Sequence, residues 1–268
     1  MFQAKRKAVN GAVGLFLAAA MLAASPGEMQ ASQYLTEASE AAQASQYLTG
    51  IPETIQASQL PEDSEIGQHA LGASVKKSKG MEYQTWKTQK GVVCVVKNTK
   101  SYALNLVATC TFYNKSKKKV GDRSTANYCL EAGKQCVFSF LTPRNSKGKT
   151  VTFNSHKISF RASRARSSIE YGTKYIKTIK KSKTATGVSA KFKNNSKKKW
   201  QFIHATCIFY DSKGRAIGES SQYLHCEKPK SSVSAVFSQP RDTKSYQPLK
   251  WKSYKIFIDY AYKYRSAK

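Results

Sequence analysis

Six cysteines are the residues whose type and spacing most clearly point to a chemistry, the formation of disulfide bonds. The segment ATCTFYN at 108–114 returns 97 positions later as ATCIFYD at 205–211, which aligns Cys110 with Cys207. Cys129 and Cys226 are related by the same offset. A repeat of this length predicts two similar folding units in one chain, each with its own pair of cysteines.

The repeat narrows the fifteen ways in which six cysteines can pair. The second copy holds only Cys207 and Cys226, so a bond within that copy must join these two. The equivalent cysteines of the first copy, Cys110 and Cys129, are expected to pair in the same way. The two cysteines left over in the first copy are replaced in the second by Ala190 and Ala235, as expected for a bond that one copy lacks. The predicted bonds are Cys207–Cys226, Cys110–Cys129 and Cys94–Cys136. Buried free thiols are the alternative.

Other reactive side chains form no recognisable catalytic or metal-binding pattern. The sequence has no Gly-x-Ser-x-Gly, His-Glu-x-x-His or phosphate-cradling glycine motif. Its histidines have no zinc-ligand spacing, and His204 is interpreted as a solvated strand residue. His225 beside Cys226 could suggest a thiol nucleophile, but the predicted disulfide occupies that sulfur. We therefore predict a protein that is not an enzyme and that has no metal and no cofactor.

Positive charge is the dominant chemical property of the chain. Of its 45 Lys and Arg three precede residue 76, and of its 16 Asp and Glu seven do, so residues 76–268 carry 42 basic and 9 acidic groups. The resulting net charge of +33 far exceeds the magnitude of about 2–8 that keeps a small domain soluble, which indicates attraction to a polyanion. Lys outnumbers Arg by 36 to 9, and because Lys is a hydrated point charge, this attraction should be diffuse.

The candidate polyanion-binding residues are the basic clusters of this region, with a merely solvated surface as the alternative. They are Lys117, Lys118, Lys119, Lys197, Lys198, Lys199, Arg161, Arg164, Arg166, Lys180 and Lys181.

Both copies alternate apolar and polar residues as half-buried β-strands do. The alternation runs through 92–97 and 106–112 in the first copy and through 188–193 and 203–209 in the second. Short strands with turns at regular spacing predict an all-β protein of two tandem antiparallel Ig-like β-sandwiches, at 76–167 and 168–268. Helices should be nearly absent after residue 75.

One strand and its turn resemble a known family. The segment CIFYD at 207–211, followed by Gly214, resembles the motif of FxLYD-type domains, and FYN at 112–114 is a second copy without the acid. Cys207 and Phe209 stand where the motif has its leading Phe and its Leu. These domains are small β-sandwich modules of secreted and envelope proteins of bacteria, mainly Gram-positive. The resemblance implies a non-catalytic extracytoplasmic module and supplies no functional residues.

The N-terminal part reads as an export signal followed by a linker. Lys5, Arg6 and Lys7 precede an apolar stretch that ends at Ala24, so we expect a signal peptide at 1–31, cleaved somewhere in 24–31, with an uncleaved anchor as the alternative. Residues 32–75 contain no Lys or Arg, and the motif QASQYLT of 30–36 recurs at 43–49 and begins again at Gln56, with a period of 13. They are expected to form a disordered acidic linker, or else a pro-segment that folds back on the basic domains.

These features predict a secreted or cell-envelope-associated, strongly cationic binding or adaptor module. Its expected partners are anionic polymers of the envelope, such as teichoic acids, or anionic lipid head groups. The alternatives are a structural or protein-interaction module of the cell surface, an extracellular nucleic-acid binder, and a secreted effector that acts on host glycans. Loss of binding at about 0.5 M salt would favour a polyanion over a protein partner.

Overall fold

The computed structural model describes residues 74–265, which form an all-β fold. Fourteen strands pair into four antiparallel sheets, and the only helical element in this part of the chain is one 3₁₀ turn, η1 (Thr173–Tyr175). The prediction of an all-β antiparallel protein is therefore confirmed. None of the described residues belongs to a helix that could cross a membrane. The predicted signal peptide (1–31) and nearly all of the predicted linker (32–75) lie outside the described residues.

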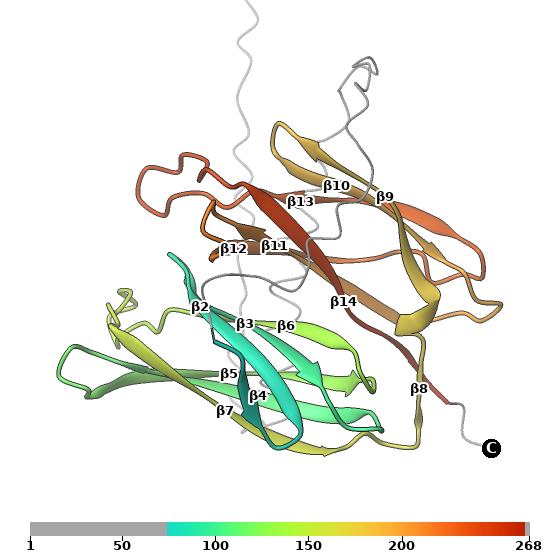
Figure 1. Ribbon diagram of the computed structural model, residues 1–268, viewed down its shortest axis with the longest axis horizontal. Coiled ribbons are helices and arrows are strands. Elements are labelled where there is room, and N and C mark those ends of the chain that lie inside the picture. Colours follow the sequence, from blue (N-terminus) through green and yellow to red (C-terminus); the bar gives the residue numbers. More distant parts are fainter. Residues whose placement is uncertain (1–73, 266–268) are drawn as a thin grey trace, which may run out of the picture. The chain divides into compact units, whose positions relative to one another are not determined.

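The first half of the described chain forms two sheets that pack face to face, which we call the first sheet pair (Figure 1). Their strand orders are β1-β2-β3-β6 and β5-β4-β7. The strands are β1 (Lys76–Ser78), β2 (Met81–Lys87), β3 (Gly91–Asn98), β4 (Leu104–Tyr113), β5 (Lys119–Leu130), β6 (Gln135–Leu141) and β7 (Ser155–Arg164).

The second half forms the second sheet pair, with strand orders β13-β10-β9 and β12-β11-β14-β8. The short strand β8 precedes the others in sequence and pairs with β14 at the edge of its sheet. The strands are β8 (Ile169–Tyr171), β9 (Ile176–Thr184), β10 (Gly187–Asn194), β11 (Phe202–Tyr210), β12 (Ala216–Tyr223), β13 (Ser232–Ser238) and β14 (Ser253–Tyr264).

Each sheet pair has its own apolar core between its two sheets. The alternation seen in the sequence places the core residues, since successive side chains of a strand point to opposite faces. In β4 every second residue from Leu104 to Phe112 is buried. In the second sheet pair Val188 and Phe237 of one sheet pack with Phe209 of the other.

The two sheet pairs share local interactions at equivalent positions. Asn98 ends β3 and is fully buried, and its amide nitrogen donates to the carbonyl oxygens of Tyr102 and Leu130 at 2.8 and 3.0 Å. Asn194 ends β10, is equally buried, and donates to the carbonyls 4 and 33 positions further on at 3.0 and 3.1 Å. Each side-chain oxygen accepts a hydrogen bond from the backbone N–H two residues later. The sequence repeat is therefore also a repeat of hydrogen-bonding geometry.

A pair of glycines shows the same equivalence. Gly91 and Gly187 begin β3 and β10 with φ angles of 151° and 150°. A Cβ on Gly91 would lie 1.9 Å from the carbonyl oxygen of Phe140, and one on Gly187 would lie 2.0 Å from that of Phe237. Only glycine fits at both positions, because the backbone of the neighbouring strand occupies the place of a side chain.

A third apolar cluster joins the outer faces of two sheets. It contains Trp86, Val93 and Val95 of the first sheet pair and Ile208 and Phe257 of the second. As a result β3, and β11 over most of its length, are buried on both faces. The expectation of half-buried strands is wrong for these two, because the sheets β1-β2-β3-β6 and β12-β11-β14-β8 cover part of each other.

The cysteines correct the sequence-based pairing. All six lie within the described residues, and each is a buried, unbonded thiol. Cys110 stands opposite Arg123 in the β4–β5 ladder, and Cys207 stands opposite Ser220 in the β11–β12 ladder. Leu130, next to Cys129, stands opposite Leu104, and Glu227, next to Cys226, accepts a hydrogen bond from the backbone N–H of Trp200. Each predicted partner therefore lies about six residues along the neighbouring strand from its cysteine, about 20 Å at 3.3 Å per residue. A disulfide requires Cα atoms within about 7 Å, so the predicted bonds Cys110–Cys129 and Cys207–Cys226 are wrong.

The third predicted bond is also not formed. Cys94 pairs with Phe138 in the β3–β6 ladder and Cys136 pairs with Val96, so the two cysteines are diagonal neighbours on one face. Diagonal neighbours are about 7–8 Å apart, which is beyond the usual span of a disulfide.

Candidate functional site

Four lysine side chains share the outer face of the sheet β13-β10-β9. In the β9–β10 ladder Lys180 stands opposite Lys191, and Lys177 stands opposite Lys193. Residues directly opposite each other in an antiparallel pair share a face, and so do residues two positions apart in one strand. We call Lys177, Lys180, Lys191 and Lys193 the lysine face.

A β-bulge aligns these four side chains. The register shifts between Lys191 and Phe192, which leaves Ile179 of β9 without a partner in β10. Without this extra residue Lys193 would stand opposite Thr178, whereas the bulge brings it opposite Lys177.

The lysine face has no compensating negative charge. Strands β9, β10 and β13 together contain six lysines and no Asp or Glu. The four ammonium groups form no ion pair with any described residue. Because like charges directly opposite each other destabilise a sheet, the arrangement is unfavourable unless an anion binds between them.

Protection of a sheet edge does not account for this arrangement. Lysines on an edge strand such as β9 prevent pairing with other chains, but Lys191 and Lys193 lie on β10, the central strand of the sheet. Ser232 stands opposite Lys193 and Ser234 opposite Lys191 on the other side of β10. The face therefore presents ammonium and hydroxyl donors, which suit the oxygens of a phosphate.

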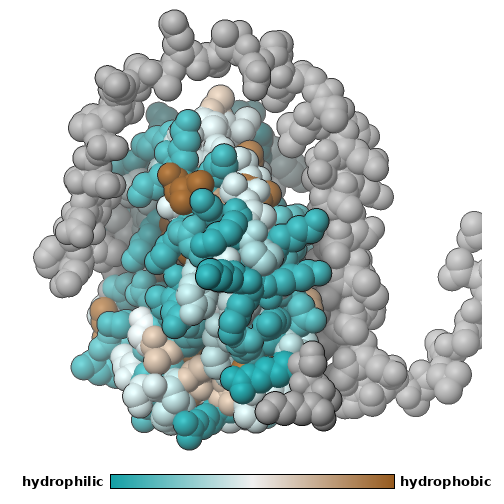
Figure 2. All heavy atoms as spheres, turned by 90° about the vertical axis from the view of Figure 1, so that its right-hand side faces the viewer, coloured by the Kyte–Doolittle hydropathy of each residue, from teal (hydrophilic) through white to brown (hydrophobic). Residues whose placement is uncertain are grey.

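Figure 2 shows the molecule from the side on which β8 and β9 lie in Figure 1. This face is dominated by hydrophilic side chains, with scattered hydrophobic ones. The side chains of β9 after Ile176 are all exposed. A polymer could therefore reach the lysine face without displacing other parts of the sheet pair.

The predicted basic residues are distributed over several surfaces. Among them only Lys180 belongs to the lysine face. Lys181 stands opposite Ala190, a residue of the core, so it points to the other side of β9. Lys117, Lys118 and Lys119 lie at the β4–β5 hairpin of the first sheet pair, where Lys119 pairs with Asp122.

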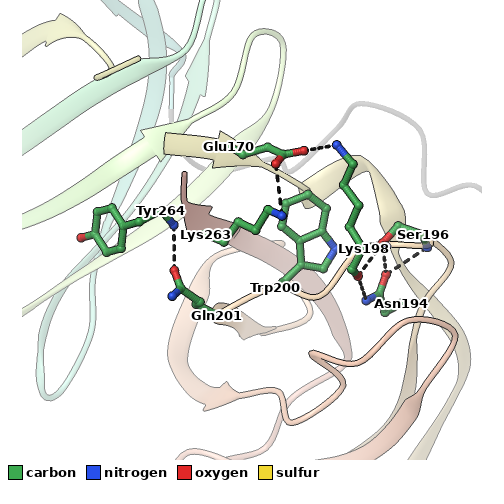
Figure 3. A network of polar contacts seen from close by, with 8 residues as sticks. All are labelled: Glu170, Asn194, Ser196, Lys198, Trp200, Gln201, Lys263 and Tyr264. Carbon is green, nitrogen blue, oxygen red and sulfur yellow. Dashed lines mark hydrogen bonds and ion pairs between the residues drawn. The ribbon is translucent and has the colours of Figure 1, made fainter. Parts of the chain in front are cut away.

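The run 197–199 lies in the turn between β10 and β11, and part of its charge is neutralised. The ammonium group of Lys198 pairs with Glu170, which also lies 3.3 Å from Lys263 (Figure 3). The hydrogen bond from Lys198 and the proximity of Lys263 hold the pKa of Glu170 below its ordinary value. Lys198 therefore helps to anchor β8, while Lys197 and Lys199 are exposed at the turn.

The three predicted arginines lie on or after β7. Arg161 pairs with Val107 on the outer face of the first sheet pair. The guanidinium of Arg164 lies over the ring of Tyr102, 5.2 Å from its centroid. Arg166 follows the strand. None of the three belongs to the sheet that carries the lysine face.

A buried carboxylate forms a second polar site. Asp259 on β14 is 4% exposed and accepts hydrogen bonds from Nδ1 of His204 at 2.9 Å and from the hydroxyl of Thr206 at 2.6 Å. His204 is therefore not the solvated strand residue expected from the sequence. No Ser, Thr or Cys among the described residues forms a hydrogen bond with its other ring nitrogen.

A surface depression of about 440 Å³ beside the β1–β2 turn is lined by Lys77, Lys79 and Glu82 among others. In the part of the chain that the structure describes, no group of three or more His, Cys, Asp or Glu is placed to hold a metal ion.

Comparison with known proteins assigns no family to this chain. No protein-family model and no curated protein matches the chain. Among solved structures, the crystal structure of red sea bream transglutaminase is similar over 72% of this chain, with 11% sequence identity and a TM-score of 0.19. The chain spans 29% of the length of that transglutaminase. A likeness at this level carries no argument about fold or activity.

Proposed function

We propose that this protein is an exported, non-catalytic binding module that attaches to anionic polymers of the bacterial cell envelope, such as teichoic acids, through the lysine face. The observation that carries the proposal is the placement of Lys191 and Lys193, on a central strand, directly opposite Lys180 and Lys177. Phosphates bound between these pairs would remove the repulsion that the empty face suffers.

We interpret the two sheet pairs as tandem Ig-like domains of the FxLYD type, with bounds at 76–167 and 168–268. The equivalent asparagines and glycines of the two halves support this interpretation. The motif at 207–214 has a structural role that fits the family: the carboxylate of Asp211 accepts hydrogen bonds from the backbone N–H groups of Lys213 and Arg215 at 2.9 Å each. Asn114 holds the equivalent turn through the N–H of Lys118.

The N-terminal sequence pattern, a basic segment followed by an apolar stretch that ends at Ala24, supports export. The charge of the globular part gives the partner class, because teichoic acids and anionic lipids are the abundant polyanions of a Gram-positive envelope.

The proposal is tested by sedimentation of the protein with isolated Gram-positive cell walls, together with titration of inorganic polyphosphate. The wild type should sediment with the walls at 50 mM NaCl and should be released at about 0.5 M, where screening is severe. The variant Lys177→Gln/Lys180→Gln/Lys191→Gln/Lys193→Gln should bind polyphosphate about tenfold more weakly at 0.1 M salt and with a shallower salt dependence.

A matched control removes the same charge elsewhere. The variant Lys115→Gln/Lys118→Gln/Lys147→Gln/Lys213→Gln changes exposed lysines of turns and should weaken binding less than about threefold. Equal losses in the two variants would show that net charge, and not the lysine face, governs binding. Sedimentation that persists at about 0.5 M salt would instead indicate a protein partner.

A further inference from the structure

Half of the outer face of the sheet β12-β11-β14-β8 is lined by aromatic rings. The other half carries Ile208, Tyr210 and Phe257, which pack against the first sheet pair. The register places aromatic side chains from each of the three longer strands on this half of the face. We call them the aromatic strip: Tyr223 of β12, His204 and Phe202 of β11, and Tyr260, Tyr262 and Tyr264 of β14.

The rings of the strip form a continuous series. The centroid of Tyr223 lies 5.0 Å from that of His204, which stacks on Tyr260 at 5.3 Å with an interplanar angle of 18°. Tyr260 and Tyr262 are 5.5 Å apart, and Tyr262 lies 5.0 Å from Phe202. Phe202 also contacts Tyr264 at 6.3 Å, edge to face. Six rings therefore follow one another across three strands.

The strip has a buried floor and an exposed rim. Tyr260 and Tyr262 pack with Cys129 at the end of β5, where the first sheet pair reaches the strip. Phe202, Tyr223 and Tyr264 are 39%, 51% and 53% exposed. Large apolar side chains that gather at the surface mark a binding site more often than single exposed ones do.

The surrounding polar contacts fix the strip in place. The bulge in β14 aims Asp259 at His204, and their 2.9 Å hydrogen bond holds the imidazole against Tyr260. The backbone N–H of Tyr264 donates to the side-chain oxygen of Gln201 at 2.7 Å. Figure 3 shows the ring of Tyr264 pointing away from Glu170 and Lys198, whose ion pair anchors β8. The rings are thus preorganised for a ligand, which lowers the entropic cost of binding.

The chemistry of the strip favours unpaired bases over sugars. The strip offers no free carboxylate to the hydroxyls of a sugar, because that of Asp259 is buried and already accepts three hydrogen bonds. Stacking on aromatic rings, by contrast, needs no directional partner and accepts every base, since each has a π face. Two exposed arginines, Arg166 and Arg265, lie near the end of the strip. The backbone carbonyl of Arg166 accepts a hydrogen bond from the hydroxyl of Tyr171 of β8, and Arg265 directly follows Tyr264.

We propose that the aromatic strip is a stacking platform for the unpaired bases of a single-stranded nucleic acid. The ammonium and guanidinium groups of the strongly cationic chain attract the phosphates, and the exposed rings of Phe202, Tyr223 and Tyr264 stack on the bases. The strip lies on a different sheet from the lysine face. The two proposals can therefore fail separately.

The test compares two polyanions of equal charge, labelled dT20 and a polyphosphate, by fluorescence anisotropy at 0.1 M salt. The wild type should bind dT20 at least about tenfold more tightly than the polyphosphate, because only dT20 offers bases. The variant Phe202→Ala/Tyr223→Ala should lose at least about tenfold in affinity for dT20 and less than about twofold for the polyphosphate. Phe202→Tyr, which keeps the ring, should bind dT20 as the wild type does.

The control variant Tyr102→Ala/Tyr246→Ala removes two exposed rings outside the strip and should leave dT20 binding unchanged. Equal affinities of the wild type for dT20 and the polyphosphate, or equal losses in the strip and control variants, would refute the platform. Competition of a neutral oligosaccharide with dT20 would reassign the strip to glycans. The lysine-face variant should lower the affinity for both polyanions. If its affinities stayed unchanged, only the function proposed above would be contradicted.

Discussion

The carboxylate of Asp259 accepts a hydrogen bond of 2.7 Å from the backbone N–H of Val137, so a side chain of the second sheet pair satisfies a backbone donor of the first. This contact depends on the bulge in β14. His204 pairs with Tyr260 and Ala205 with Ile258, which leaves Asp259 outside the ladder. A bulge re-aims the side chain of its extra residue, and here it directs a carboxylate into the junction of two sheets.

Asp259→Ala is expected to lower the free energy of unfolding by about 3 kcal/mol. The substitution leaves three donors without an acceptor in a buried place, and each unsatisfied buried group costs about 1–3 kcal/mol before the structure relaxes. Urea unfolding followed by circular dichroism measures the change. Asp122→Ala, which removes an exposed carboxylate paired with Lys119, should change the midpoint little. Equal effects of the two variants would show that the Asp259 contacts do not stabilise the fold.

Asn98→Ala and Asn194→Ala should destabilise the protein by similar amounts, about 2–3 kcal/mol each. Both amides are buried and join the end of a strand to two other segments, and their loss leaves backbone carbonyls unpaired. Asn195→Ala, at an exposed neighbouring position, is the control. If only one of the two variants is destabilised, the equivalence of the asparagines is structural but not energetic.

The class of the fold could be predicted from the sequence because strand patterns are local. The alternation in 106–112 is the same alternation of burial that β4 shows. The burial of both faces of β3 was also encoded, since Val92 to Val96 form a continuous apolar run, which is the pattern of a strand covered on both sides.

Register could not be predicted, and the site depends on it. Equivalence between the copies relates Cys110 to Cys207 correctly, but it does not say which residue stands across the ladder from either. The lysine face likewise depends on the register of two strands. Lys191 and Lys193 occupy outward positions of an alternating segment, yet only the bulge at Ile179 brings Lys177 opposite Lys193, beside the pair of Lys180 and Lys191. Among the candidate binding residues chosen from the sequence, only Lys180 is therefore a member of the lysine face.

The cysteines should behave as six protected thiols. Burial raises the pKa of Cys110 and Cys207 to about 12 and that of Cys226 to about 11, so the reactive thiolate is scarce at pH 8. Iodoacetamide should label the native protein slowly and should label six sulfurs once the chain is unfolded without reductant. Mass spectrometry counts the labels. Fewer than six labels on the unfolded chain would reveal disulfides and contradict the structure.

His156 should make the fold less stable in mild acid. Burial, followed by the ammonium groups of Lys76 and Lys87, lowers its pKa below the ordinary 6.5, and its Nε2 lies 3.0 Å from the hydroxyl of Thr85. The unfolded chain therefore binds a proton at a higher pH than the folded chain does. Stability contributed by the neutral ring is fully present above pH 6.5 and falls as the pH drops from 6.5 to the lowered pKa of the folded state.

His156→Gln keeps a polar side chain that can bond to Thr85 but does not titrate. Urea unfolding of both proteins between pH 8 and pH 5 should show a constant difference in unfolding free energy above pH 7, because neither form gains a proton there. Below pH 6.5 the wild type should lose stability more steeply than the variant, so that the two curves converge or cross. Carboxylates with lowered pKa, such as Glu170 and Asp211, act in both proteins at lower pH and cancel in the comparison. Parallel curves down to pH 5 would mean that the folded protein accommodates the charged imidazole without cost.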